Sequence, residues 1–184
     1  LILLGHGENS IFETLLEIQE TYPSLPLFPV IADVRELDRL NSVFKRMHPE
    51  VVFHAAAHKH VPLMELNIDE AINNNVMGTR NVVKVCEQND VQRLVMISTD
   101  KAIRPINIMG ASKRLAEMIV LEARLPRPGS GAWRERLDQI EITPLILPRL
   151  VIADARFTQE IDAECQAVVP AAFELGDRRG DVAA

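Results

Sequence analysis

The 184-residue chain is poor in cysteine and in aromatic side chains, and it carries no excess of positive charge. Its two cysteines, Cys86 and Cys165, form no Cys-x-x-Cys pair, which argues against a structural zinc site and favours a reducing compartment. The formal net charge of −6 gives no electrostatic reason to expect nucleic acid or an anionic membrane as a partner. Small ligands remain as candidates.

A long apolar run is also missing. A helix that spans a bilayer needs roughly 20 apolar residues, and the best stretch, residues 140–153, is interrupted by Glu141, Pro144, Pro148 and Arg149. The chain does not open with the basic and apolar segments of a signal peptide. We therefore expect a cytoplasmic chain that does not itself contact a membrane.

The chain does contain short apolar runs that alternate with segments of helical periodicity. This alternation is typical of a parallel sheet covered by helices on both faces. The sequence therefore predicts an α/β fold of the Rossmann-like, doubly wound kind. The predicted strands cover residues 1–4, 27–31, 51–57 and 93–98, and the predicted helices cover about residues 11–22, 37–47, 69–86 and 109–121.

The alternation decays after Leu121. Prolines, glycines and a serine between residues 126 and 131 indicate a loop or linker, and residues 142–153 are a candidate strand whose two prolines disfavour a central position. The last residues have the composition of a marginal helix grading into a disordered end. We expect a partial Rossmann domain over residues 1–124, and a linker with a weakly structured tail over residues 125–184.

The stretch richest in chemistry lies between the fourth strand and the last helix. Residues 98–101, Ser-Thr-Asp-Lys, directly follow an apolar run, and ligands of open α/β sheets bind at the carboxyl ends of the strands. Met109 and Lys113 are four residues apart, so they share one face of the predicted helix. A ligand site is therefore predicted at this junction.

Three segments together resemble one protein family: residues 54–65 (HAAAHKHVPLME), 74–79 (NNVMGT) and 98–113. They are similar to the CapD-like polysaccharide biosynthesis proteins, which belong to the extended short-chain dehydrogenase/reductase superfamily and include UDP-N-acetylglucosamine 4,6-dehydratases. The resemblance runs from about residue 1 to residue 122, in order and at ordinary spacing. Three long motifs in one order are far more specific than a lone glycine motif.

The resemblance implies an enzyme that removes water from a UDP-sugar with the help of NAD or NADP. Such an enzyme takes hydride from C4 of the hexose, eliminates the C6 hydroxyl and returns the hydride to C6, so it needs an acid and a base side by side. By similarity, Asp100 is the general acid and Lys101 is the base for the C5 proton. Thr99 and Ser98 hydrogen-bond around the reacting sugar, Ser98 on the cofactor side. A desolvated pocket or a nearby positive charge, such as Lys113, is expected to lower the pKa of Lys101.

Met109 occupies a catalytic position at which most short-chain dehydrogenases have tyrosine, and a thioether cannot remove a hydroxyl proton. By similarity it is typical of the longer, usually membrane-anchored branch, whose products retain the C5 configuration. C4 oxidation is then left to water or to Asp100. The resemblance also implies binding roles for other residues. Lys113 would bind the nicotinamide ribose, Asp33 and Val34 would contact adenine, and the cofactor would lie along Ala55, Ala56 and Ala57. Asn75 would be the active-site amide, and Lys59 would contact the substrate.

Two parts of the family pattern are missing. The first strand and its glycine-rich turn, which places the pyrophosphate at a helix N-terminus, are absent, and Gly5-His6-Gly7 ends the strand that follows that turn. Because the missing strand is central in the doubly wound order, we expect a gap in the sheet or a different pairing of strands. The strand and substrate lobe that follow Leu121 in the family are also absent. We therefore expect a fragment of a larger enzyme or the product of a disrupted reading frame.

Simpler interpretations of the same residues stay open. The Asp-Lys pair at 100–101 is an ordinary loop ion pair in one of them, and in another Asp33 caps the following helix. His54 is predicted to be a hydrogen-bonded structural histidine. His58 and His60 lack a third ligand at a suitable spacing, so no metal site is expected.

Two classes of function follow. The first is a nucleotide-sugar 4,6-dehydratase, with a related epimerase as its near neighbour. The second is a catalytically incompetent module that at most binds or assembles, because the phosphate-binding turn is missing. A second copy of the chain is a candidate partner in either case.

Overall fold

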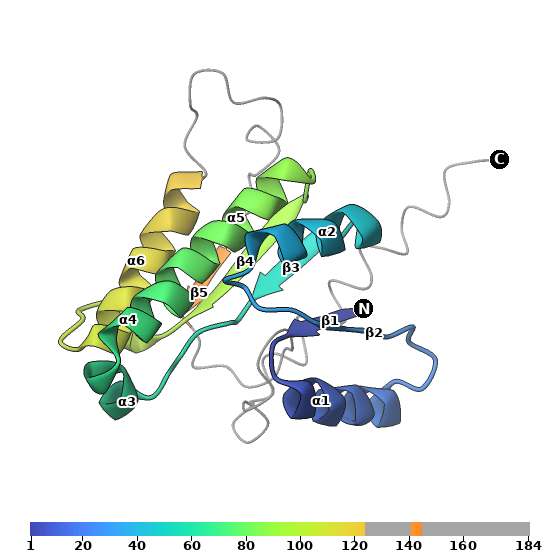
Figure 1. The fold of residues 1–184 in the computed structure, drawn as a ribbon, viewed down its shortest axis with the longest axis horizontal. Helices are drawn as coiled ribbons and strands as arrows, with labels where there is room; N and C mark the ends of the chain where they lie inside the picture. The colour runs from blue at the N-terminus through green and yellow to red at the C-terminus, as the bar shows by residue number, and fades with distance from the viewer. Residues whose placement is uncertain (124–140, 145–184) are drawn as a thin grey trace.

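The computed structural model describes residues 1–123 and residues 141–144 (Figure 1). Strands and helices alternate along them and every strand pair is parallel, which confirms the predicted α/β class. The strands are β1 (Ile2–Gly5), β2 (Phe28–Ile31), β3 (Val51–His54), β4 (Arg93–Ser98) and β5 (Glu141–Pro144). The helices are α1 (Glu8–Thr21), α2 (Leu37–Met47), α3 (Val61–Leu66), α4 (Ile68–Glu70), the π-helical η1 (Ala71–Met77), α5 (Gly78–Gln88), the 3₁₀ turn η2 (Asp100–Ala102) and α6 (Ile108–Ala123).

The strands form two sheets. In the first, β1 pairs with β2, with Ile2 opposite Phe28; in the second, β4 lies between β3 and β5. Within the described residues β1 and β3 share no ladder, so the sheet is open where a central strand was expected to be missing. Pro29 lies in β2, which pairs only with β1, and such a strand tolerates proline.

One apolar cluster nevertheless joins the two sheets. Leu4 of β1 and Val30 of β2 belong to the same cluster as Val82 of α5 and as Leu94 and Met96 of β4. Helix α5 packs between α2 and α6, whereas α1 contacts β1 and β2 from the other side of the strands (Figure 1). Helices therefore cover both faces. Among the described helices, none is long and apolar enough to cross a bilayer.

The segment between β3 and α5 differs most from the prediction. The third strand ends at His54, so residues 55–57 lie in the connection that follows it. A helix, α3, forms where a polar loop was expected, and Pro62 lies in its first turn, where the missing proline N–H is not needed. The helix predicted over residues 69–86 is present, but its first half is the π-helical segment η1.

The candidate strand within residues 142–153 is present as β5. Its described residues are Glu141–Pro144, and it pairs with β4 at the outer edge of the described sheet. The rest of the predicted linker and tail, residues 124–140 and 145–184, lies outside the described residues.

Candidate active site

A short polar turn follows β4. The Thr99 hydroxyl donates to Asp100 Oδ1 at 2.9 Å and accepts from the Lys101 backbone N–H at 3.4 Å. Lys101 Nζ lies 3.6 Å from Asp100 Oδ1, and the two side chains are 53% and 65% exposed. The loop ion pair considered above is therefore present. The described residues do not form the desolvated pocket that was expected around Lys101.

The Asp100 carboxyl is held in its ionised form. The hydrogen bond from Thr99 is the largest cause that lowers its pKa below the usual value, and the charge of Lys101 is the next. An ionised carboxylate cannot donate a proton at neutral pH. Asp100 must therefore accept a proton before it can act as an acid.

Helix α6 begins directly against this turn. Asn107 caps the helix, because its Oδ1 accepts from the Gly110 N–H at 2.7 Å, and Glu65 of α3 accepts from the Ile108 N–H at 2.7 Å. A Cβ atom at Gly110 would collide with the carbonyl oxygen of Lys101. The absence of a side chain at this position lets the first turn of α6 pack against η2.

Met109 and Lys113 both lie buried on α6. Met109 is 2% exposed and packs in a small apolar cluster with Met64 of α3 and Ala71 of η1. Lys113 is 7% exposed, and its Nζ donates to the carbonyl of Ile97 in β4 at 3.3 Å. Burial lowers the pKa of Lys113 to about 8. Lys113 is therefore a buried ammonium group close to the carboxyl end of β4.

Asn75 ties three elements together. Its Oδ1 accepts from the His58 N–H at 2.7 Å, and its Nδ2 donates to the His58 carbonyl at 3.2 Å and to Ser112 Oγ at 2.9 Å. Asn75 belongs to η1, and single-turn π-helical segments occur frequently at functional sites. The amide fixes the connection after β3 against α6.

His54 is a buried, hydrogen-bonded histidine, as predicted. Its Nε2 lies 2.8 Å from Thr79 Oγ1, and the Thr79 hydroxyl donates to the Asn75 carbonyl at 2.6 Å. The hydroxyl proton is therefore engaged, so Nε2 carries the proton shared with Thr79. Burial, and next the charge of Lys113, lower the pKa of His54 to about 4.

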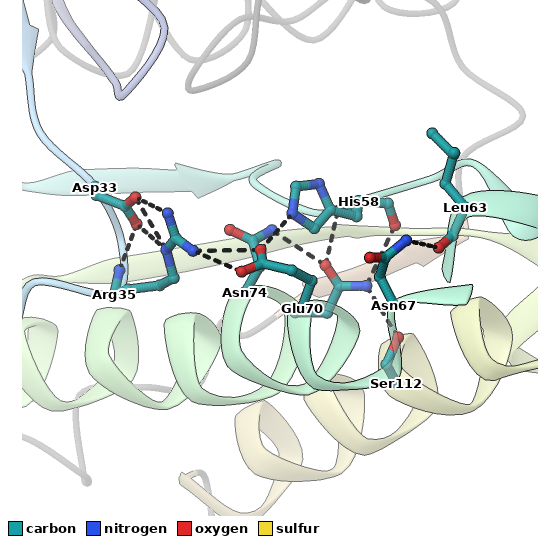
Figure 2. Close-up of polar contacts among 9 residues, drawn as sticks. Asp33, Arg35, His58, Leu63, Asn67, Glu70, Asn74 and Ser112 are labelled. Carbon is teal, nitrogen blue, oxygen red and sulfur yellow. Dashed lines mark hydrogen bonds and ion pairs between the residues drawn. The ribbon is translucent and has the colours of Figure 1, made fainter. Parts of the chain in front are cut away.

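Asp33 takes part in an ion-pair network that crosses the ends of β2 and β3. The Arg35 N–H donates to Asp33 Oδ1 at 2.8 Å, and Arg35 Nη2 donates to Asp33 Oδ2 at 2.6 Å. Arg35 also reaches Glu70 at 3.3 Å, and Glu70 lies 3.4 Å from His58 Nε2 (Figure 2). Asp33 does not cap α2, because Glu36 is the N-cap residue and makes no side-chain cap. The hydrogen bond from Arg35 lowers the pKa of Asp33.

A hollow lies beside Asp33, where β1, β2 and β3 end. Most side chains around it are small, which is what a flat ring or a pyrophosphate requires for close approach, and Asp33 offers an acceptor at its edge. The residues that line it are Gly5, His6, Ala32, Val34, Ala56, Ala57 and Asn74. Val34, Ala56 and Ala57 were predicted here, whereas Asn74 and His6 were not.

The predicted residues thus form two groups. Val34, Ala56 and Ala57 surround the hollow, and residues 98–101 form the turn after β4 with Lys113 near its base. Lys59 lies in the connection from β3 to α3. The Asn75 amide lies between the groups.

The parallel strands, the polar carboxyl ends and the buried helix lysine define a Rossmann-like protein of the short-chain dehydrogenase/reductase class. Residues 1–129 match the family model described as "Polysaccharide biosynthesis protein". The chain therefore belongs to this family, and the predicted membership is confirmed.

Relatives share about half to two thirds of the chain. It is 53% identical over 121 residues to the capsular polysaccharide biosynthesis protein CapD of Staphylococcus aureus, which covers 65% of this chain and 20% of CapD. It is 40% identical over 93 residues to UDP-N-acetylglucosamine 4,6-dehydratase (inverting) of Campylobacter jejuni, covering 50% and 27%. It is 46% identical over 101 residues to UDP-glucose 4-epimerase of Rickettsia massiliae, covering 54% and 29%. The chain spans between 20% and 29% of the length of these relatives.

Solved structures share the fold. The structure of Pen from Bacillus thuringiensis matches with a TM-score of 0.60 and 32% identity, over 67% of this chain and 36% of Pen. The structure of dTDP-4-dehydrorhamnose reductase from Bacillus anthracis, in complex with NADP, matches with a TM-score of 0.53 and 27% identity, over 66% and 49%. The Rossmann-like fold class is thereby confirmed.

Proposed function

We propose that this chain carries the cofactor face and the acid-base pair of a nucleotide-sugar 4,6-dehydratase. Its substrate is a UDP-hexose of the UDP-N-acetylglucosamine type. The observation that carries the proposal is the turn after β4, in which Asp100 and Lys101 lie in contact at the carboxyl edge of a parallel sheet, beside the helix that carries Lys113. The dehydratase relative named above supports this assignment.

NAD or NADP fits the residues present. The adenine end would lie at the ends of β1 to β3, where Val34 and small side chains line a hollow, and Asp33, the residue before Val34, would offer it an acceptor. Lys113 offers its ammonium group to the ribose at the other end, and Asn75 holds the intervening connection in place. When bound, the cofactor takes hydride from C4 of the sugar and returns it to C6.

The proton steps follow from the charge state of the turn. Asp100 is ionised, so it accepts the C4 hydroxyl proton as hydride leaves C4. Lys101, which must first release its ion-pair proton to solvent, then takes the C5 proton that the C4 ketone has made acidic, and Asp100 returns its proton to the departing C6 hydroxyl. Lys101 gives the proton back to C5 as hydride arrives at C6. One molecule of water is lost, and the acid and base return to their starting states.

Met109 explains why Asp100 would serve in two steps. The buried thioether cannot take the C4 hydroxyl proton, and the exposed carboxylate of Asp100 can. A single base, Lys101, removes and returns the C5 proton on one face. The product should therefore retain the C5 configuration.

Deuterium at C4 of UDP-N-acetylglucosamine tests the reaction. The assay uses the 184-residue chain, and a longer chain that adds a strand, a glycine-rich turn and a crossover helix ahead of Leu1, each with NAD and with NADP. The proposal predicts a product lighter by one water with the label at C6. Lys101→Ala should abolish turnover. Arg104→Ala, which removes an exposed positive charge from the same loop, should not. Turnover by Lys101→Ala would contradict the role of Lys101.

Two other functions are distinguished by the same assay. The UDP-glucose 4-epimerase relative supports an epimerase, which would return the label to C4 without loss of water. Within the part of the chain that the structure describes, the edges of β1 and β3 that face each other are unpaired, which favours a non-catalytic binding module that would give no turnover in either chain.

A further inference from the structure

Glu117 of α6 is a buried carboxylate outside the acid-base pair and the cofactor face. It is 6% exposed, and both of its oxygens are engaged. Oε1 accepts the hydroxyl proton of Ser98, and Oε2 accepts from Arg114 Nη1 at 2.7 Å. A charged group is retained in such a position only when it is paired and hydrogen-bonded.

The contact with Ser98 fixes the end of β4. Ser98 is 5% exposed, is the last residue of the strand and directly precedes Thr99. Glu117 and Lys113 are one helical turn apart on α6, and Lys113 binds the carbonyl of Ile97, the residue before Ser98. Two charged side chains of α6 therefore hold the last two residues of β4, from which the acid-base turn begins.

Glu117 also supplies the negative charge nearest to Lys113 that favours its ammonium form. His54, at the end of β3, is neutral at pH 7 and does not offset it. On the other elements packed against α6, Glu65 of α3 is engaged by the Ile108 N–H, and the side chains of Asp100 and Lys101 in η2 lie exposed. Burial therefore lowers the pKa of Lys113, whereas the negative charge of Glu117 raises it.

We propose that Glu117 is a positioning residue of this site: it aligns the Thr99–Lys101 turn through Ser98, and it keeps the buried Lys113 charged. This inference rests on the proposed function for its catalytic consequence. The contacts that carry it stand without that function.

Two variants separate the two effects. Glu117→Gln keeps an oxygen for Ser98 but removes the charge, and Glu117→Ala removes both. Glu122→Gln is the matched control, because it removes one exposed negative charge from the same helix. The first readout is the pKa of Lys113, which is measured by an NMR titration of isotope-labelled lysine in the chain without substrate. The second readout is the pH profile of kcat.

In Glu117→Gln, the pKa of Lys113 should fall below the value of about 8 in the parent chain, and the alkaline limb of the kcat profile should move to lower pH with it. In Glu117→Ala, kcat should also fall by about ten-fold or more, because the turn loses its alignment. Glu122→Gln should change neither readout. Circular dichroism shows whether each variant is folded, and Glu117→Gln preserves the test if the alanine variant is not.

An unchanged pKa of Lys113 in Glu117→Gln would overturn the charge role. Unshifted backbone amide signals of residues 99–101 in folded Glu117→Ala would overturn the positioning role. A parent chain without turnover would instead contradict the proposed function, and the two NMR readouts would still decide the role of Glu117.

Discussion

The titratable side chains beneath the site are buried, whereas those at its surface are exposed to solvent. Lys113, Glu117 and His54 are all under 10% exposed, whereas the side chains of Asp100 and Lys101 are more than half exposed. Burial lowers the pKa of Lys113 and of His54, and the Glu117 carboxylate is bonded to Ser98 and Arg114. The chemistry at the surface therefore depends on charges that are fixed below it.

His54 should make stability sensitive to acid. Its pKa is about 4 in the folded chain and near 6.5 when unfolded, so the unfolded chain binds the proton first as pH falls. The free energy of unfolding should then be fully present above about pH 6.5 and should fall by up to about 3 kcal/mol toward pH 4. Urea unfolding across this range should show a shallower pH dependence in His54→Gln than in the parent chain.

The exposed His60 provides the control for this measurement, and His60→Gln should keep the parental pH dependence. Equal slopes in the parent chain and in His54→Gln would mean that His54 does not titrate differently in the two states. The comparison between variants also cancels the pH dependence that carboxylates with lowered pKa values, such as Asp33 and Asp100, contribute to every variant.

The role of a single residue could be predicted where that residue belongs to a motif or ends an apolar strand. His54 ends an apolar strand, and its structural role followed from that position. Glu117 was missed, although a carboxylate four residues after Lys113 on an apolar helix face is an available signal. The ion pair between Arg35 and Glu70 joins residues 35 positions apart, and no local pattern contains that information.

Among the elements, the contact between η2 and α6 positions the acid-base turn. It exists because Gly110 has no Cβ, and the carbonyl oxygen of Lys101 occupies that space. Asn107 and Glu65 satisfy the first N–H groups of α6 at the same place. The helix start and the turn therefore form one packed unit.

Gly110→Ala should break this unit. The added methyl meets backbone rather than a flexible side chain, so either the turn or the helix start must move, at a cost of about 1–3 kcal/mol in unfolding free energy. Amide signals of residues 99–101 should shift in NMR spectra. Gly7→Ala is the control, because its Cβ would meet only the Ser10 side chain at 3.2 Å. Equal effects of the two substitutions would contradict the close contact at Gly110.

Apolar periodicity predicted most elements, including α2 and β4 with their observed bounds. It did not predict α3, because two histidines and a lysine precede the helix and its six residues are too few to show a helical period. The π-helical segment η1 was also missed. Its widened turn is stabilised by contacts such as that of Asn75 with His58, which lie outside the helix itself.

At the scale of the whole molecule, the open position between β1 and β3 matters most. Each of these strands pairs on one side only within the described residues, while both contribute to or pack against a single apolar cluster. The missing pairing could be predicted only by comparison with the family pattern. The local sequences of β1 and β3 do not indicate that one edge of each strand is unpaired.

A strand, a glycine-rich turn and a crossover helix, added in that order ahead of Leu1, should place the new strand parallel to β1 and β3 and pair it with both edges. The free energy of unfolding should rise by more than about 2 kcal/mol, because the new strand buries apolar side chains. Hydrogen exchange should slow at the amides of β1 and β3 but change little in β4, which already pairs on both sides. An extension with two prolines in the strand cannot complete the ladders and should give neither effect. The same stabilisation from both extensions would contradict insertion between the sheets.

The most direct test of the cofactor face is a calorimetric titration of the 184-residue chain with NADH and with NADPH. We expect micromolar binding of one of them, about −8 kcal/mol, weakened by Asp33→Asn and by Lys113→Met but not by Arg104→Ala. No detectable heat from a chain that circular dichroism shows to be folded would contradict a cofactor site formed by these residues.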